Sequence, residues 1–147
     1  MDKDFVGNPA LTDFAGSDSF LLNNLFINKD LLVIDFWGSW CVPCISSIPD
    51  FKKLYETYSV NRIGFLGILY DDLQNNKKIE SVINKNEIKW RQAFINRIDS
   101  NTLIDEWRIF SFPTYLVINK QHKVVFRGIG STGFLKLKEF LEISIRE

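Results

Sequence analysis

Residues 31–44 have the sequence LLVIDFWGSWCVPC, in which a mainly apolar run with one carboxylate leads into a pair of cysteines. Cys41 and Cys44 are the only cysteines in the chain, and two residues separate them. Two thiols at this spacing can close a small ring, so the pair predicts a disulfide that forms and breaks reversibly. This stretch therefore points to redox chemistry.

The apolar pattern around this stretch predicts the secondary structure. Residues 31–37 lack polar alternation, which is typical of a strand covered on both faces. From Cys41 onward, apolar residues recur every three or four positions, as in a helix, and Pro49 lies inside this pattern. The other expected elements are turns and short strands over 1–30, strands over 63–70, 93–95, 114–119 and 123–127, helices over 75–85 and 101–107, and a last helix capped by Ser131 or Thr132. This order predicts an α/β fold, with a central mixed β-sheet flanked by helices on both faces.

Composition restricts the class of protein. The chain has 147 residues, 46% of them hydrophobic, and 18 basic side chains balance 18 acidic ones. This length fits a single domain over residues 1–147, and the balanced charge offers no basic field for nucleic acid. No apolar run approaches the ~20 residues of a membrane span, and the N-terminus lacks the basic and apolar segments of a secretory leader. We therefore expect a monomer without nucleic-acid partners that is cytoplasmic as the chain stands.

Other functions of the two thiols would require residues or spacings that can be checked in the sequence. A structural zinc site needs four ligands, whereas the chain has two cysteines and one histidine. Haem attachment needs a histidine where Ile45 stands, and a purely structural disulfide across two residues closes too short a loop to stabilise much. We expect no metal site and no cofactor besides the redox-active Cys41–Cys44 disulfide. Binding or delivery of a soft metal, Cu(I), by the same dithiol stays open as an alternative.

The two cysteines and a nearby carboxylate are each expected to have a different catalytic role. Cys41 lies where the strand ends and the helix begins, so free N–H groups and the helix dipole favour its thiolate. Cys44, one turn further, is expected to lie deeper and to attack a mixed disulfide formed on Cys41. Asp35 is expected to be buried, where the pKa of a carboxyl rises, and to accept the Cys44 proton. The alternative for Asp35 is a strand-end carboxylate bound to a turn. His122 is expected to be a solvated turn residue.

Several motifs resemble one known family. Residues 35–44, DFWGSWCVPC, are similar to the active-site segment of thioredoxins, and Pro49 matches the proline of their kinked helix. Residues 111–114, SFPT, resemble the cis-proline loop, and Gly128 and Gly130 precede the last helix. Residues 71–110 are longer than in thioredoxin and resemble the insertion of TlpA/ResA-like thiol-disulfide oxidoreductases, which are related to the AhpC/TSA grouping. The resemblance implies a thioredoxin fold with an N-terminal extension over residues 1–30. It also implies a helical insertion between the second and third core strands.

The resemblance also implies an activity. It implies a thiol-disulfide oxidoreductase that acts as a reductase on disulfide-containing protein substrates and is recharged by an upstream electron donor. Substrate would bind at Trp40, Pro43, Phe112 and Pro113, with a cis Phe112–Pro113 bond. Members of this subfamily are usually exported, so a periplasmic or cell-envelope location is expected if a leader was removed. A related possibility is that the chain is the C-terminal domain of a larger envelope protein.

Three positions depart from the related families. The TlpA/ResA-like subfamily more often has asparagine at the position of Asp35. At this position the chain is more similar to thioredoxin itself. Only Asp71 or Asp72 offers a rough counterpart to a glutamate near the thiols of ResA-like proteins. Gly38 occupies the position where peroxiredoxins have threonine, which argues against peroxidase chemistry.

Overall fold

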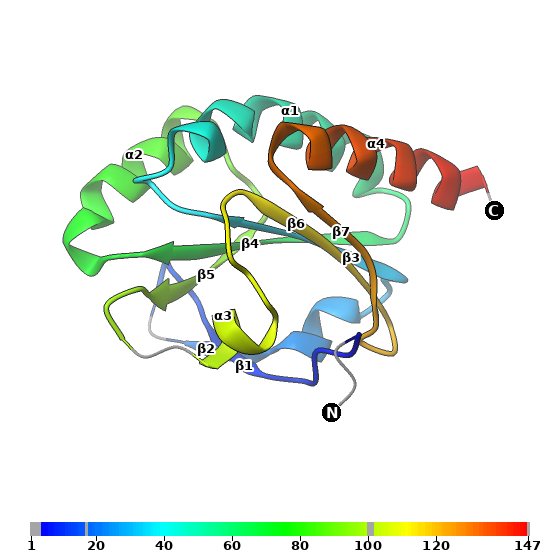
Figure 1. Cartoon of the computed structure of the whole chain (residues 1–147), viewed down its shortest axis with the longest axis horizontal. Coiled ribbons are helices and arrows are strands. Elements are labelled where there is room, and N and C mark those ends of the chain that lie inside the picture. The colour runs from blue at the N-terminus through cyan, green and yellow to red at the C-terminus, as the bar shows by residue number, and fades with distance from the viewer. Residues whose placement is uncertain (1–3, 17, 100–101, 147) are drawn as a thin grey trace.

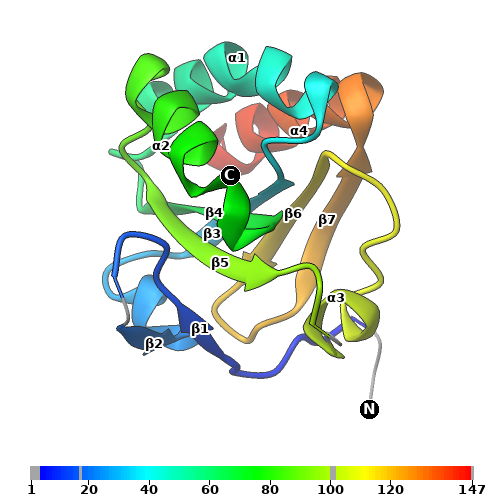
Figure 2. The same cartoon turned by 90° about the vertical axis from the view of Figure 1, so that its left-hand side faces the viewer.

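A five-stranded mixed sheet in the order β5-β4-β3-β6-β7 forms the centre of the protein (Figures 1 and 2). The computed structural model describes residues 4–16, 18–99 and 102–146. Strand β3 (Leu31–Trp37) runs parallel to β4 (Ile63–Asp71) and antiparallel to β6 (Thr114–Asn119). At the two edges, β5 (Arg91–Asn96) pairs parallel with β4, and β7 (Val124–Ile129) pairs antiparallel with β6. The predicted thioredoxin-type mixed sheet is confirmed.

The two faces of the sheet are covered differently (Figures 1 and 2). Three long helices pack on one face: α1 (Val42–Tyr58), α2 (Asn76–Lys85) and α4 (Gly130–Arg146). The short helix α3 (Thr102–Glu106), the hairpin β1–β2 (Ala10–Thr12, Ser19–Leu21) and the 3-10 helix η1 (Leu22–Phe26) lie on the other. A second 3-10 turn, η2 (Leu73–Asn75), leads into α2. In the part of the chain that the structure describes, none of these helices is long and apolar enough to cross a membrane.

The alternation of side chains along β3 divides the interior into two cores. Val33 and Trp37 pack with the cysteines and helices α1 and α4, whereas Leu32, Ile34 and Phe36 pack with the N-terminal segment. Since successive side chains of a strand point to opposite faces, Asp35 faces the same side as Val33 and Trp37. The pleat of the central strand therefore directs the one carboxylate of this strand toward the helices that carry the thiols.

Two expectations about individual elements need correction. The strand expected over 93–95 is longer, because β5 pairs with β4 over six residues from Arg91 to Asn96. Helix α4 begins at Gly130, directly after β7, so Ser131 and Thr132 lie inside the helix and do not cap it. The expected helix start at residue 101 lies outside the described residues.

His122 is not the solvated turn residue that we expected. Its ring Nδ1 contacts the backbone oxygen of Gly7, and its ring stacks on Phe26 with the centroids 5.4 Å apart. The prediction was wrong because the N-terminal segment folds back onto the β6–β7 turn, where Val6 N also donates to His122 O. The histidine thus helps to attach the N-terminal segment to the sheet.

Candidate active site

The two cysteines form a disulfide at the point where β3 ends and α1 begins. Cys41 is the N-cap residue of α1, and the backbone N–H of Cys44 points at Cys41 Sγ across 3.3 Å. The exposed fraction is 5% for Cys41 and 1% for Cys44, so Cys44 is the deeper of the two, as expected. A thiolate on Cys41 would receive this N–H and the positive end of the helix dipole, both of which stabilise an anion.

A loop from a distant part of the sequence lies against Cys41. The Phe112–Pro113 peptide bond is cis, and the backbone oxygen of Phe112 lies 3.7 Å from Cys41 Sγ. The loop is fixed on both sides, because the Thr114 hydroxyl donates to Ser111 O and the N–H of Gly130 donates to Pro113 O. The loop therefore presents polar backbone atoms directly beside the more exposed sulfur.

Asp35 is buried on the helix-covered face of β3 and retains an exposed fraction of only 4%. Its Oδ1 is fully buried without a hydrogen-bond partner, and the residue lies inside β3 with two more strand residues after it. Burial disfavours the ionised form and raises the pKa of Asp35 to about 8. A carboxyl with this pKa holds its proton at neutral pH and exchanges it near pH 8, which suits a group that accepts and releases protons.

Three aromatic side chains, Trp40, Tyr70 and Phe112, form an aromatic rim beside the disulfide. The edge of Trp40 meets Phe112 with ring centroids 5.3 Å apart, and Tyr70 stacks on Phe112 at 5.5 Å. The indole N–H of Trp40 donates to Tyr70 O at 2.7 Å, which holds the ring in place. Pro43 is exposed between the two cysteines. The structure thus brings Trp40 and Phe112 into contact, and Pro113 directly follows Phe112 in the chain.

Asp71, at the end of β4, holds the cysteine-bearing loop in place. Its carboxylate accepts hydrogen bonds from Ser39 N at 2.6 Å, Asp72 N at 2.8 Å and Asn75 Nδ2 at 2.9 Å. The side chain is fully buried, so these bonds replace its hydration. The sequence offered one signal, because a carboxylate at the C-terminal end of a strand parallel to β3 lies at the same edge as the thiols. The role of this side chain as an anchor for Ser39 became visible only in the structure.

Replacing Asp71 with asparagine should loosen this loop. An asparagine side chain has only one acceptor oxygen, so its amide NH₂ would face a backbone N–H that now donates to Asp71. A buried donor that loses its partner costs about 1–3 kcal/mol, and we expect the free energy of unfolding in urea to fall by this amount. Asp72→Asn is the matched control, because Asp72 Oδ1 has no hydrogen-bond partner. Equal losses in the two variants would contradict the anchoring role of Asp71.

A pair of hydroxyls connects β6 to the first turn of α1. The Tyr115 hydroxyl donates to Ser47 Oγ at 3.2 Å, and the Ser47 hydroxyl donates to Cys44 O at 2.9 Å. Tyr115 is the direct neighbour of Asp35 across the β3–β6 ladder. Burial, followed by the nearby Asp35 carboxylate, raises the pKa of Tyr115, so its hydroxyl stays protonated and keeps donating. The sequence analysis missed this pair, because it depends on the strand register.

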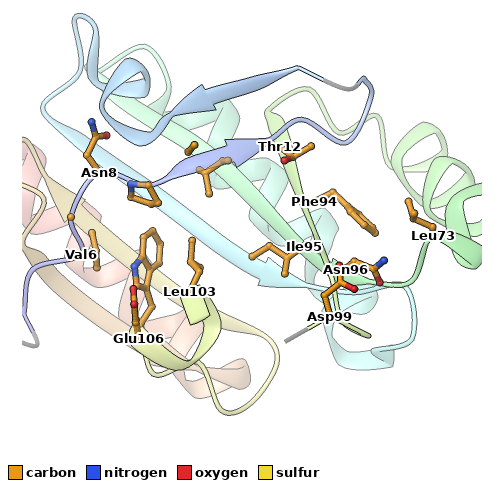
Figure 3. A pocket seen from close by; sticks show the side chains of 15 residues that line it. Val6, Asn8, Thr12, Leu73, Phe94, Ile95, Asn96, Asp99, Leu103 and Glu106 are labelled. Carbon is orange, nitrogen blue, oxygen red and sulfur yellow. The ribbon is translucent and has the colours of Figure 1, made fainter. Parts of the chain in front are cut away.

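A sizeable cavity lies elsewhere in the molecule. It has a volume of about 830 Å³ and is lined by residues 6–12, the end of β5 and helix α3 (Figure 3). Neither cysteine and no member of the aromatic rim borders it. Among the described residues, no group of three or more His, Cys, Asp or Glu side chains is placed to hold a metal ion. The chemistry of the site therefore centres on the disulfide and the groups around it.

Known proteins share this sequence pattern and this fold. A family model of thioredoxin-like proteins matches residues 28–124. Sporulation thiol-disulfide oxidoreductase A of Bacillus subtilis is 28% identical over 112 residues, covering 75% of this chain and 66% of that protein. The thiol-disulfide oxidoreductase ResA of Bacillus cereus is 27% identical over 119 residues, covering 78% of this chain and 65% of ResA. The chain thus spans slightly less than two thirds of the length of these relatives.

A solved structure extends the similarity to the fold. A thiol-disulfide oxidoreductase from Bacteroides fragilis superimposes with a TM-score of 0.76 at 24% identity, covering 92% of this chain and 98% of that one. The sequence match over residues 28–124 includes both cysteines and the Phe112–Pro113 loop. The chain therefore belongs to the thioredoxin-like family, and over this domain it is similar to thiol-disulfide oxidoreductases such as ResA.

Proposed function

We propose that this protein reduces disulfides in protein substrates, with Cys41 as the attacking and Cys44 as the resolving cysteine. The observation that carries the proposal is the position of the disulfide at the start of α1, with Cys41 as the more exposed sulfur beside Phe112 O. The proposal takes residues 1–147 as a single domain that acts as a monomer.

The proposed reaction has two exchange steps. The Cys41 thiolate attacks one sulfur of a substrate disulfide, forms a mixed disulfide, and releases the other substrate sulfur as a thiolate. Cys44 then loses its proton and attacks Cys41 Sγ, which closes the Cys41–Cys44 disulfide and releases the second substrate sulfur as a thiolate. The two substrate thiolates take up protons, and an upstream donor later returns two electrons and two protons to the protein.

Asp35 would be the proton acceptor for Cys44. Both side chains face the same core, and the pKa of Asp35 is raised to about 8, close to the ordinary pKa of a thiol. A base with this pKa takes the thiol proton at little cost and returns it easily, which is the condition for efficient general base catalysis. Trp40, Pro43, Phe112 and Pro113 would contact the substrate, because Phe112 O lies 3.7 Å from the attacking sulfur and the other three stand next to Phe112 or within two residues of Cys41 in the chain.

The residues between the two cysteines favour a reductase over an oxidase. A strong oxidant stabilises its reduced form, and above all the thiolate of the attacking cysteine. Here Val42 and Pro43 stand between the cysteines and bring no positive charge that would stabilise this thiolate. The dithiol should therefore give up its electrons readily.

Partners and location follow from the relatives. ResA-like relatives imply protein substrates, and relatives of the ResA and DsbE kind are associated with the cell envelope. We therefore propose disulfide-containing envelope proteins as substrates, and a thiol-bearing upstream donor as the reductant. The whole protein would work in the periplasm or at the envelope.

The reduction potential tests this proposal. We expect equilibration with glutathione buffers to give a value closer to about −270 mV, as in thioredoxin, than to about −120 mV, as in the oxidase DsbA. The same protein should accelerate the reduction of insulin by dithiothreitol. A potential near about −120 mV would contradict the reductase direction, and no acceleration of insulin reduction would contradict the activity itself.

A further inference from the structure

We propose that Arg97 selects substrates in which an acidic residue lies close to the reacting cysteine. The inference rests on the proposed function and adds a substrate class to it. Arg97 follows the last residue of β5, and its backbone N–H donates to Asp71 O at 2.9 Å. This bond fixes the chain beside the end of β4, next to the loop that carries Cys41.

The guanidinium group of Arg97 lies on the aromatic rim. Its Cζ is 4.3 Å from the ring centroid of Trp40 and 6.0 Å from that of Tyr70, within the range of cation–π attraction. Trp40 is itself held by its hydrogen bond to Tyr70 O and precedes Cys41 in the chain. Arg97 is therefore an ordered positive charge at the border of the disulfide.

This charge has no partner within the described part of the chain. The ion pairs there are Lys52–Glu87, Arg62–Asp30, Arg91–Asp13 and Lys120–Asp30, and none includes Arg97. The nearest acidic side chain along its backbone contact, Asp71, is buried and already accepts three hydrogen bonds. Its carboxylate is therefore unavailable as a partner for the guanidinium.

The surroundings make Arg97 the charge that a docked substrate would meet. Trp40, Val42 and Pro43 are exposed and uncharged, and no acidic side chain lies in the first turn of α1. A guanidinium that stacks on an aromatic ring keeps its edge N–H donors free to bind a carboxylate in two parallel hydrogen bonds. The complementary partner is an extended substrate segment with Asp or Glu near its cysteine.

The test uses peptides that differ in one residue. Each peptide carries one cysteine in a mixed disulfide with a chromogenic aryl thiol, and Glu, Gln or Lys two residues before and after it. Cys41 thiolate attacks the peptide sulfur and releases the aryl thiolate, whose absorbance reports the rate. We expect the reduced wild-type protein to react about two- to fivefold faster with the Glu peptide than with the Gln peptide, and more slowly with the Lys peptide. The preference should shrink in 1 M salt.

Two variants separate recognition of charge from support of Trp40. Arg97→Gln should remove the preference, and Arg97→Glu should reverse it. Arg91→Gln is the matched control, because Arg91 stacks on Phe20 at 3.7 Å at the opposite end of β5 and its loss changes the net charge equally. This control should keep the wild-type preference.

Several results would overturn the proposal. Equal wild-type rates with the Glu and Lys peptides would do so, as would a uniform slowing of Arg97→Gln with an unchanged preference, which would assign Arg97 to the support of Trp40 alone. Failure of the reduced wild-type protein to react with any peptide would instead overturn the proposed function, and this inference with it.

Discussion

Replacing Cys44 with serine is expected to stop the reaction at the mixed disulfide and to leave the substrate bound covalently to Cys41. The serine hydroxyl cannot attack a disulfide at neutral pH, so the second exchange step has no nucleophile. The first step should survive, because Cys41 is the more exposed sulfur and lies at the helix N-cap, where its thiolate is stabilised. Turnover in the insulin assay should fall roughly a thousandfold or more.

The trapped complex can be measured directly. Reduced Cys44→Ser protein, mixed with a protein disulfide, should give a species on a non-reducing gel with the summed mass of both partners, and dithiothreitol should release it. Cys41→Ser is the matched control, since it changes the same pair but keeps only the buried sulfur. This control should form little complex and have no turnover. Equal trapping by both variants would contradict the assignment of attacking and resolving roles.

Much of the core fold is predictable from local patterns. The strand over residues 31–37 shows an unbroken apolar run, and the helix from Val42 shows a clear three-to-four period, so both follow from burial alone. The Phe112–Pro113 loop was identified through its likeness to a family motif. No local pattern places residues 111–114 beside Cys41, because Phe112 stands 71 positions after it in the sequence.

The covering of the second sheet face was not predictable in the same way. Strands β1 and β2 have three residues each, too few to show a period, and their buried members are single side chains such as Leu11 and Phe20. The contact of His122 with Gly7 depends on the return of the N-terminal segment to the β6–β7 turn. Such contacts depend on tertiary packing, which cannot be predicted from the periodicity of the sequence.

The residues around the aromatic rim were also only partly predictable from the sequence. Trp40 and Phe112 were expected near the substrate, whereas Tyr70 and Arg97 were not expected there. Tyr70 is the Cα partner of Ile95, and this register brings Arg97, two residues later, over Trp40. A shift of the β4–β5 register by one residue would turn the side chains of β5 to the other face. The register emerges from the packed sheet, so it could not be predicted from the single stretch around Cys41.

Asp35→Asn is expected to make the protein more stable at alkaline pH while slowing its reaction. The pKa of Asp35 is about 8 in the folded protein and 3.8 in the unfolded reference. Well below pH 3.8 the carboxyl is protonated in both states, so its titration does not change the free energy of unfolding. Between pH 4 and pH 8 the unfolded state ionises first, so stability is lost as the pH rises, by roughly 1.4 kcal/mol for each pH unit. Above pH 8 both states are ionised and the loss is constant.

The difference in the free energy of unfolding between Asp35→Asn and the wild type separates the titration of Asp35 from that of other groups. Urea unfolding should show the advantage of the variant growing steadily from pH 5 to pH 8 and reaching several kcal/mol. Glu56→Gln controls for the removal of a negative charge, since Glu56 is exposed on the same helix that carries Cys44. The difference for this control should stay flat. A flat difference for Asp35→Asn as well would contradict the raised pKa.

The same variant links stability to catalysis. If Asp35 accepts the Cys44 proton, its loss should slow the closing of the Cys41–Cys44 disulfide by about a hundredfold, whereas the attack of Cys41 should change much less. The wild-type closing rate should rise with pH up to about 8, as Asp35 ionises, and the variant should lose this rise. Stopped-flow measurement of the second step gives both profiles. A gain in stability together with an unchanged closing rate would make Asp35 a buried charge without a catalytic role. A gain in stability together with slower closing of the disulfide would show that Asp35 destabilises the fold but serves as the base for Cys44.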